Sequence, residues 1–148
     1  MVKDIIKDLN ELSKKCEKCT KNDEQLISKI IRDLIDTGKH YAEETELGCV
    51  GLAANQIGYN KRIIIVNAKN NIWVPFINPV ITNHSKSTHK SEEGCLSIEG
   101  TRETFRYNTI EIMFRNVTNF NKIEKKVFRG GTSVILQHEI DHLNGILI

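Results

Sequence analysis

Two histidines near the end of the chain have the spacing of a metal site. His138 and His142 are four residues apart, and on a helix such residues share one face, so both imidazoles can bind the same divalent ion. Glu139 follows the first histidine, where a carboxylate can take a proton from a metal-bound water. This segment therefore predicts a metal-dependent hydrolase.

A catalytic metal usually has three protein ligands and one open position, so a third ligand is needed. Many zinc peptidases supply it downstream, in the pattern H-E-x-x-H-x-x-G-x-x-H. Here that last position is Ile148, and residues 143–148 contain no His, Cys, Asp or Glu. The best upstream candidate is Cys95. A thiolate and two imidazoles around a divalent ion leave one positive charge, which acidifies a bound water.

Three segments together resemble one protein family. The family patterns E-G-C-x-S and Q-H-E-x-D-H are complete at residues 93–97 and 137–142. The pattern G-x-G-x-A-A-x-Q matches residues 49–56, except that Cys49 replaces its first glycine. The three segments also follow the family order. The chain thus resembles peptide deformylase, a metallohydrolase that removes the formyl group from new N-terminal methionines, from about Asp23 to its end.

The resemblance implies a role for each matched residue. The thiol and the two imidazoles hold the metal, whose bound water attacks the formyl carbon. Glu139 takes the proton from that water and passes it to the leaving amine, releasing formate. The Gln56 amide and the Leu96 backbone N–H donate to the charge that grows on the formyl oxygen. The substrate-binding positions are Val50, Gly51, Gly94, Arg102, Val134 and Ile135, of which the three apolar ones line a pocket for methionine.

For several residues of these segments the sequence leaves the role open. Gly51 and Gly94 can serve tight turns or allow a substrate backbone to approach closely. Arg102 can hold a loop or the substrate backbone, or it can be a solvated surface charge. Asp141 can support a ligand histidine or fix the helix, and it is left out of the catalytic set. Cys49 adds a side chain near the site, and we expect it to narrow substrate entry.

The identity of the metal is not determined by its ligands. A thiolate with two imidazoles suits zinc, iron, cobalt or nickel. The resemblance implies Fe(II) as the native ion, with zinc, nickel and cobalt as alternatives. An iron–thiolate site is sensitive to oxygen, because both the metal and the sulfur can oxidise.

Two other functions stand beside the deformylase. The first is a metal-dependent peptidase or amidase with a different substrate, which a shallow or polar pocket beside the metal would favour. The second is a non-catalytic metal-binding or interaction module on the same fold. The intact set of Gln56, the three ligands and Glu139 counts against the second, because a decayed site would be expected to lose at least one of them.

Helical patterns lie at both ends of the chain. Apolar stripes predict a helix at residues 4–16 and a longer one from an Asn22 cap to about residue 42. A third helix is predicted at residues 130–142. Family members often carry a further segment after this last helix, and we expect activity without it because no matched catalytic residue lies there.

The middle of the chain has the texture of strands. Residues 62–66 are β-branched and predict a buried strand, while residues 72–81 contain two prolines and predict an interrupted or edge strand. Residues 83–91 are polar and predict a loop, followed by paired strands at 109–114 and 123–128. We therefore expect an α+β fold, with mixed strands packed around a C-terminal metal-binding helix and an N-terminal scaffold helix, in a single catalytic domain of residues 1–148.

Composition limits the partners. The chain is 39% hydrophobic and 27% charged, as is usual for a soluble globular protein. A net charge of +2 is too small to favour nucleic acid or an anionic membrane, and no apolar run reaches membrane-spanning length. The N-terminus is too charged for a signal peptide. We expect a cytoplasmic protein that acts on formyl-methionyl nascent peptides and contacts the ribosome transiently, with Cys16 and Cys19 as reduced thiols.

Overall fold

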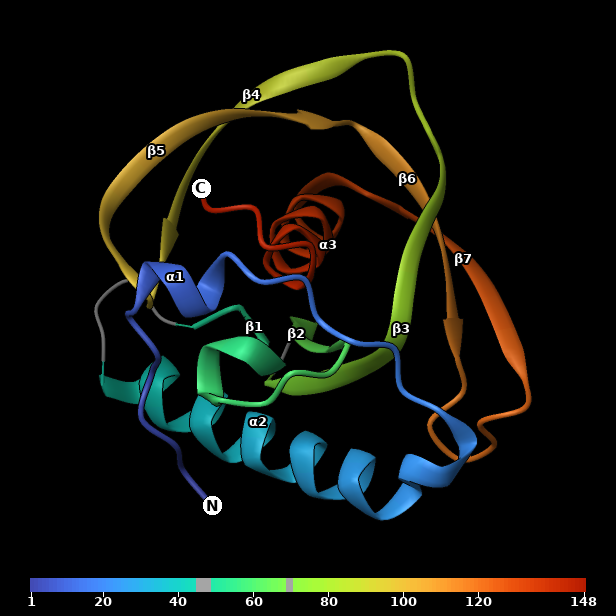
Figure 1. Cartoon of the computed structure of the whole chain (residues 1–148). Coiled ribbons are helices and arrows are strands. Elements are labelled where there is room, and N and C mark those ends of the chain that lie inside the picture. Colours follow the sequence, from blue (N-terminus) through green and yellow to red (C-terminus); the bar gives the residue numbers. More distant parts are fainter. Residues whose placement is uncertain (45–48, 69–70) are drawn as a thin grey trace.

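The computed structural model describes residues 1–44, 49–68 and 71–148. Figure 1 shows its elements in chain order. They are α1 (Leu9–Leu12), the 3-10 turn η1 (Lys21–Asp23), α2 (Glu24–Glu44), β1 (Gly51–Ala53), the 3-10 turn η2 (Ala54–Ile57), β2 (Ile63–Ala68), β3 (Ile72–His84), β4 (Thr88–Cys95), β5 (Ile98–Tyr107), β6 (Thr109–Arg115), β7 (Ile123–Arg129) and α3 (Gly130–Leu143).

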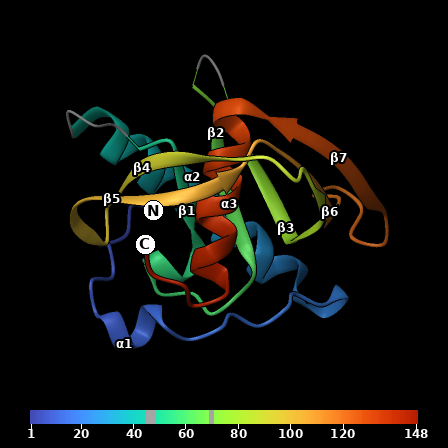
Figure 2. The same ribbon diagram turned by 90° about the horizontal axis from the view of Figure 1, so that it is seen from above.

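The strands form two sheets that surround the last helix. One sheet has five strands in the order β1-β2-β3-β6-β7, and β4 pairs with β5 in a separate hairpin. All of these pairings are antiparallel, and within the described part of the chain the only parallel pairing is an isolated bridge between Glu17 and Lys61. The expected mixture of strand directions is therefore wrong. Strands enclose α3, whereas α2 lies outside β1 and β2 (Figures 1 and 2).

The first four residues of β2 are apolar because both faces of the strand are covered there. Successive side chains of a strand point to opposite faces. Ile63 and Ile65 belong to the core cluster that includes the apolar face of α2, while Ile64 and Val66 belong to the cluster that includes α3. The predicted buried strand is confirmed, and its position between the two helices gives the physical reason for its composition.

The N-terminal part differs from its predicted helix at residues 4–16. Only Leu9–Leu12 is helical, and the Asp8 side chain accepts hydrogen bonds from the first backbone N–H groups. The preceding residues form neither helix nor strand, and Ile6 donates its backbone N–H to the Gln56 carbonyl at 2.7 Å. In a helix over residues 4–16 this N–H would lie in the first turn and have no acceptor within the helix, whereas here it is paired with η2.

The long N-terminal helix is confirmed, but its start differs. α2 begins at Glu24 after the short turn η1. The capping contact comes from Asp23, whose carboxylate accepts the Thr20 backbone N–H at 2.8 Å, and not from Asn22. Thr20 has extended backbone angles, which is the conformation that an N-cap residue requires.

The proline-containing strand was expected to be interrupted or at an edge, and the first alternative is confirmed. β3 pairs with β2 on one side and β6 on the other, so it is not an edge strand. A register shift between Ile77 and Val80 accommodates Pro79, as bulges do for prolines within sheets, and a second shift lies between Ile81 and Asn83. The prediction of a loop at residues 83–91 needs correction. Most of the predicted loop at residues 83–91 belongs to β3 and β4. The paired strands β6 and β7 are confirmed.

The four cysteines are free. Cys16 and Cys19 lie in the segment between α1 and η1 and are buried, and burial raises the pKa of these thiols to about 11 and about 12. Within the three described stretches, none of the helices combines the length and apolar character that crossing a bilayer requires.

Candidate active site

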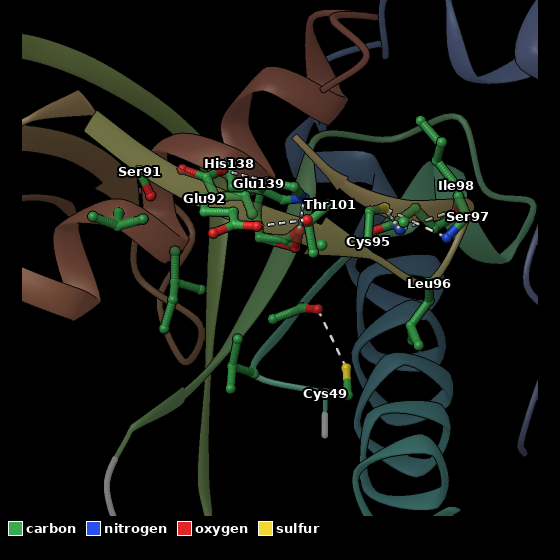
Figure 3. A pocket seen from close by; sticks show the side chains of 18 of the residues that line it. Cys49, Ser91, Glu92, Cys95, Leu96, Ser97, Ile98, Thr101, His138 and Glu139 are labelled. Carbon is green, nitrogen blue, oxygen red and sulfur yellow. Dashed lines mark hydrogen bonds and ion pairs between the residues drawn. The ribbon is translucent and has the colours of Figure 1, made fainter. Parts of the chain in front are cut away.

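A pocket of about 1010 Å³ lies between α3, β1 and the β4–β5 hairpin, and α3 presents its candidate catalytic residues to it (Figure 3). Leu136, Ile140 and Leu143 are buried against the core, which fixes the rotation of the helix about its axis. The Gln137 side chain adds to this, because it donates to the Tyr107 carbonyl and accepts the Tyr107 N–H, at 3.0 and 2.9 Å. His138 and Glu139 then line the pocket.

Cys95 lies beside His138 and His142, the two histidines that share one helix face by their spacing. Their ligand atoms lie within 4.8 Å of one another. The Cys95 Sγ to His142 Nε2 distance is 3.3 Å, and the two histidine Nε2 atoms are 3.2 Å apart. A tetrahedral ion with bonds of about 2.0–2.3 Å separates its ligand atoms by roughly 3.4–3.6 Å. These two separations lie within a few tenths of an ångström of that range, and the donor types suit a divalent ion.

The electrostatics of this cluster favour a cation. Burial lowers the pKa of His138, but its contacts with Cys95 and Glu93 raise it more, to about 10. Burial together with the neighbouring imidazole lowers the pKa of His142 to about 3, so that ring is neutral and can act as a ligand. The thiol and the carboxylate that raise the pKa of His138 would also favour a bound cation, and the neutral ring of His142 can offer it a lone pair.

A buried ion-pair network supports His138. Its Nδ1 lies 2.8 Å from Glu93 Oε1, which directs Nε2 toward the other two ligands. Arg106 donates to both Glu93 oxygens at 2.8 and 2.7 Å and to Asp141 Oδ2 at 2.6 Å. Burial alone would raise the pKa of Glu93, but the hydrogen bonds from Arg106 and His138 hold it well below its usual range. Asp141 therefore pairs with an arginine, not with a ligand histidine.

Glu139 has the environment of a proton-transfer group. It is only 2% exposed, and its Oε2 has no hydrogen-bond partner among the described residues. Its other oxygen lies 3.9 Å from His138 Nε2. Burial raises the pKa of Glu139 to about 7, where a carboxyl group can both accept and release a proton at neutral pH.

Gln56 lies directly beside the candidate metal ligand. Its Nε2 contacts Cys95 Sγ at 3.3 Å and Ser97 Oγ at 3.1 Å, and its Oε1 accepts the Ala53 N–H at 3.0 Å. These contacts orient the amide with its N–H groups toward the sulfur. Leu96, the next residue after the ligand, lines the same pocket.

The two glycines of the site differ in what they permit. Neither Gly51 nor Gly94 has a positive φ, so neither supplies a left-handed turn. A Cβ at Gly51 would lie 2.8 Å from Ile135 Cγ2 and 3.0 Å from Glu139 Cγ, so this glycine allows β1 to approach α3. A Cβ at Gly94 would make only ordinary contacts, at 3.8 Å, and its position is open toward the pocket.

The remaining predicted positions divide between the pocket and its margin. Val50, Val134 and Ile135 line the pocket, and Val50 is 52% exposed. Arg102 is absent from the described residues that line it, and it donates to the Glu99 and Ile148 carbonyls at 3.1 and 3.0 Å. It is therefore bound to backbone and is not a free surface charge.

Cys49 takes a defined place at the pocket. Its thiol donates to the Gly51 carbonyl at 3.3 Å, as Figure 3 shows. The residue is buried and lines the pocket. Burial raises the pKa of this thiol to about 12, so it keeps its proton and remains a hydrogen-bond donor.

Sequence reasoning missed three supporting residues, Arg106, Glu93 and Ser97, of which Glu93 is the first residue of E-G-C-x-S. Arg106 belongs to none of the three matched segments, and no local spacing connects it with its partners. Ser97 is the last residue of E-G-C-x-S, and its place in that pattern was the available signal. Its contact with Gln56 joins two segments that are far apart in the chain.

Comparison with known proteins gives a consistent result. The family described as polypeptide deformylase matches residues 2–148. A peptide deformylase of Clostridium beijerinckii is 49% identical over 148 residues, which cover all of both chains. The solved structure of peptide deformylase from Thermotoga maritima has a TM-score of 0.85 at 34% identity, covering 99% of this chain and 95% of that one. A Met-Ala-Ser-bound peptide deformylase of Acinetobacter baumannii has a TM-score of 0.87 at 27% identity, covering 99% and 96% of the two chains.

Proposed function

The chain belongs to the polypeptide deformylase family, and from that membership we propose that it hydrolyses the formyl group of formyl-methionyl nascent peptides, releasing formate and a free N-terminal amine. The observation that carries this proposal is the cluster of Cys95, His138 and His142 beside the buried carboxylate of Glu139. Three ligands with a proton-transfer group at the open side suit hydrolysis of an amide bond.

The three clustered side chains would hold one divalent ion, with Fe(II) as the proposed native metal and zinc, nickel or cobalt as alternatives. When bound, such an ion lowers the pKa of water and polarises a carbonyl group. Thiolate and imidazole ligands suit all four metals. The two N–H groups that Gln56 and Ser97 direct at Cys95 Sγ, at 3.3 and 3.4 Å, suit a thiolate in particular.

Glu139 is the proposed proton carrier. Its unpaired Oε2 accepts a proton from the attacking water and then delivers it to the nitrogen of the leaving amine. The Gln56 amide and the Leu96 backbone N–H are proposed to donate to the formyl oxygen as negative charge develops there. Because Gln56 is held by Ala53 and Ser97, its amide is aligned before substrate binds.

Selection of methionine is assigned to the apolar part of the pocket. Val50, Val134 and Ile135 are proposed to contact the flexible, uncharged side chain. Binding of Met-Ala-Ser by a related enzyme supports a methionyl peptide as the ligand. Gly51 and Gly94 are proposed to flank the peptide backbone, and Arg102 to hold the start of β5 through its bond to the Glu99 carbonyl.

We propose further that residues 1–148 act as one catalytic domain in the cytoplasm, where formylated nascent chains are made, with transient access to the ribosome. The alternative amidase differs from this proposal in its substrate. A formyl group carries only hydrogen on its carbonyl carbon, so a site shaped for it should reject an acetyl group.

The deciding experiment measures formate release from a formyl-Met peptide by anaerobically purified, Fe(II)-loaded protein. We expect turnover by the wild type and a loss of about 10²–10⁴-fold in kcat for Glu139→Gln, which removes the base while conserving its size. Metal content is measured in both proteins, and an acetyl-Met peptide serves as the matched substrate. No formate from fully loaded wild type would reject the deformylase, and equal cleavage of the acetyl peptide would favour the broader amidase.

A further inference from the structure

The three candidate ligands come from two separate elements, a strand and a helix. Cys95 ends β4 in the β4–β5 hairpin, whereas His138 and His142 lie on α3. The hairpin crosses over the helix (Figure 2), so the ligand set is complete only when the hairpin is docked. We propose that Arg106 is a positioning residue that docks the hairpin on α3 and thereby pre-forms the metal site, an inference that rests on the metal binding proposed above.

Arg106 binds both sides of this junction. It extends from β5, is 5% exposed, and holds Glu93 of β4 with two hydrogen bonds at 2.8 and 2.7 Å. Its remaining terminal nitrogen reaches Asp141 of α3 at 2.6 Å. The planar guanidinium has donors on separate edges, which is why one side chain can serve two carboxylates; a lysine ammonium does not have this geometry.

The charges make the arrangement depend on Arg106. Two carboxylates, from Glu93 and Asp141, face a single guanidinium, and the side chains of Glu93 and Arg106 are almost fully buried. Without the positive charge, the two carboxylates would repel each other, and the buried Glu93 would keep only its contact with His138. Moving the hairpin away from α3 is the direct way to relieve both effects.

Docking controls two of the three ligands. Glu93 Oε1 is shared between Arg106 and His138 Nδ1, so a shift of Glu93 releases the ring orientation of that histidine. Glu93 also precedes Cys95 by two residues on the same strand, so the thiol moves with it. His142 is held separately, since Asn55 donates to its backbone carbonyl at 2.8 Å. Loss of Arg106 should therefore weaken Cys95 and His138 as ligands more than His142.

The test uses Co(II) added to the metal-free full chain. Affinity is measured by competition with a chelator, and the thiolate-to-cobalt charge-transfer absorption reports whether Cys95 is bound. Arg106→Gln and Asp141→Asn should weaken Co(II) binding by about 10–100-fold and reduce this absorption, with Arg106→Lys between them and the wild type. Arg32→Gln, an exposed arginine of α2, is the control for loss of one positive charge and should bind as the wild type does.

The outcomes separate the two proposals. If the wild type binds no Co(II), the metal site of the proposed function fails, and this inference fails with it. If the wild type binds and a folded Arg106→Gln binds equally well with an unchanged charge-transfer band, the positioning role is overturned while the function stands. Circular dichroism checks folding. If Arg106→Gln does not fold, unchanged affinity in Arg106→Lys and Asp141→Asn overturns the inference.

Discussion

The position of Glu139 depends on the absence of a side chain at Gly51, which lies beside it. Gly51 of β1 lets the strand lie against α3, with the Glu139 stem and Ile135 on either side of the space that a Cβ would need. The Cys49 thiol donates a hydrogen bond to the Gly51 carbonyl and so helps to hold this strand in place. The carboxylate is therefore placed by contact with a strand as well as by its own helix.

We expect Gly51→Ala to reduce kcat by about 10–100-fold, because a displacement of about 1 Å at a catalytic group has an effect of that size. The added methyl would lie 2.8 Å from Ile135 Cγ2 and 3.0 Å from Glu139 Cγ, and overpacking should lower the free energy of unfolding by about 1–3 kcal/mol. Formate release and urea unfolding measure the two effects. Gly131→Ala, where a Cβ meets nothing within 4 Å, is the control, and a wild-type kcat for Gly51→Ala would contradict the prediction.

Residues of the site differ in how far local spacing could predict them. His138, Glu139 and His142 lie within five residues of one helix, so their positions relative to one another follow from helical geometry alone. Cys95 and Gln56 required the family patterns, because no local rule connects them with the helix. Arg106 could not be predicted, since its partners Glu93 and Asp141 are 13 and 35 residues away and become neighbours only through the docking of the hairpin.

At the scale of elements, α2 is tied to two other segments through one buried carboxylate. Asp33 accepts the Tyr59 hydroxyl at 2.6 Å and the Met1 α-amino group at 3.0 Å. Burial would raise the pKa of Asp33, but these donors hold it below its usual value of 3.8. The same hydrogen bond raises the pKa of Tyr59 to about 12.

Tyr59→Phe should lower the free energy of unfolding by about 1.5–3 kcal/mol at pH 7, the usual effect of losing a hydrogen bond to a charged group. The folded pKa of Asp33 lies below the unfolded one, so its contribution is complete above the unfolded value and is lost as pH falls through the folded value. The gap between wild type and variant should therefore close below pH 3.8. Urea unfolding at pH 7, 5 and 3 measures it, and a gap that stays constant with pH would contradict the assignment.

The elements that composition predicted well are those that bury one or two apolar faces. β2, β6, β7, α2 and α3 were all expected near their observed positions. The first half of β4, residues 88–91, was expected to be a loop because its residues are polar. Most side chains of β4 are exposed, so the strand has no hydrophobic pattern to detect. In α1 the error was the reverse: an apolar stripe at helical spacing is used instead by an extended segment that packs on η2 and α2.

At the scale of the molecule, two helices pack on opposite faces of one sheet and have different roles. α2 covers the face of β2 formed by Ile63 and Ile65 and contributes a core, while α3 covers the opposite face and carries the site. Hydrophobic patterning predicted α2, and start and stop signals predicted α3. Neither signal could predict which face each helix would cover or that β4 and β5 would form a separate hairpin. Those features depend on strand order, which is set by contacts between residues far apart in the chain.

Metal binding should therefore stabilise the whole fold by joining the hairpin to α3. An ion that binds the folded chain and not the unfolded one adds about 2.7 kcal/mol at a hundredfold excess over its Kd, which for a chain of this size raises Tm by about 5–11 °C. Thermal unfolding of Zn(II)-loaded and chelator-treated protein measures the shift. Cys95→Ser should lose most of it, because the hairpin would no longer supply a thiolate. An equal Tm for loaded and metal-free wild type, with metal content verified, would mean that the ion binds the folded and the unfolded chain equally, and it would contradict a site that forms only when the hairpin is docked on α3.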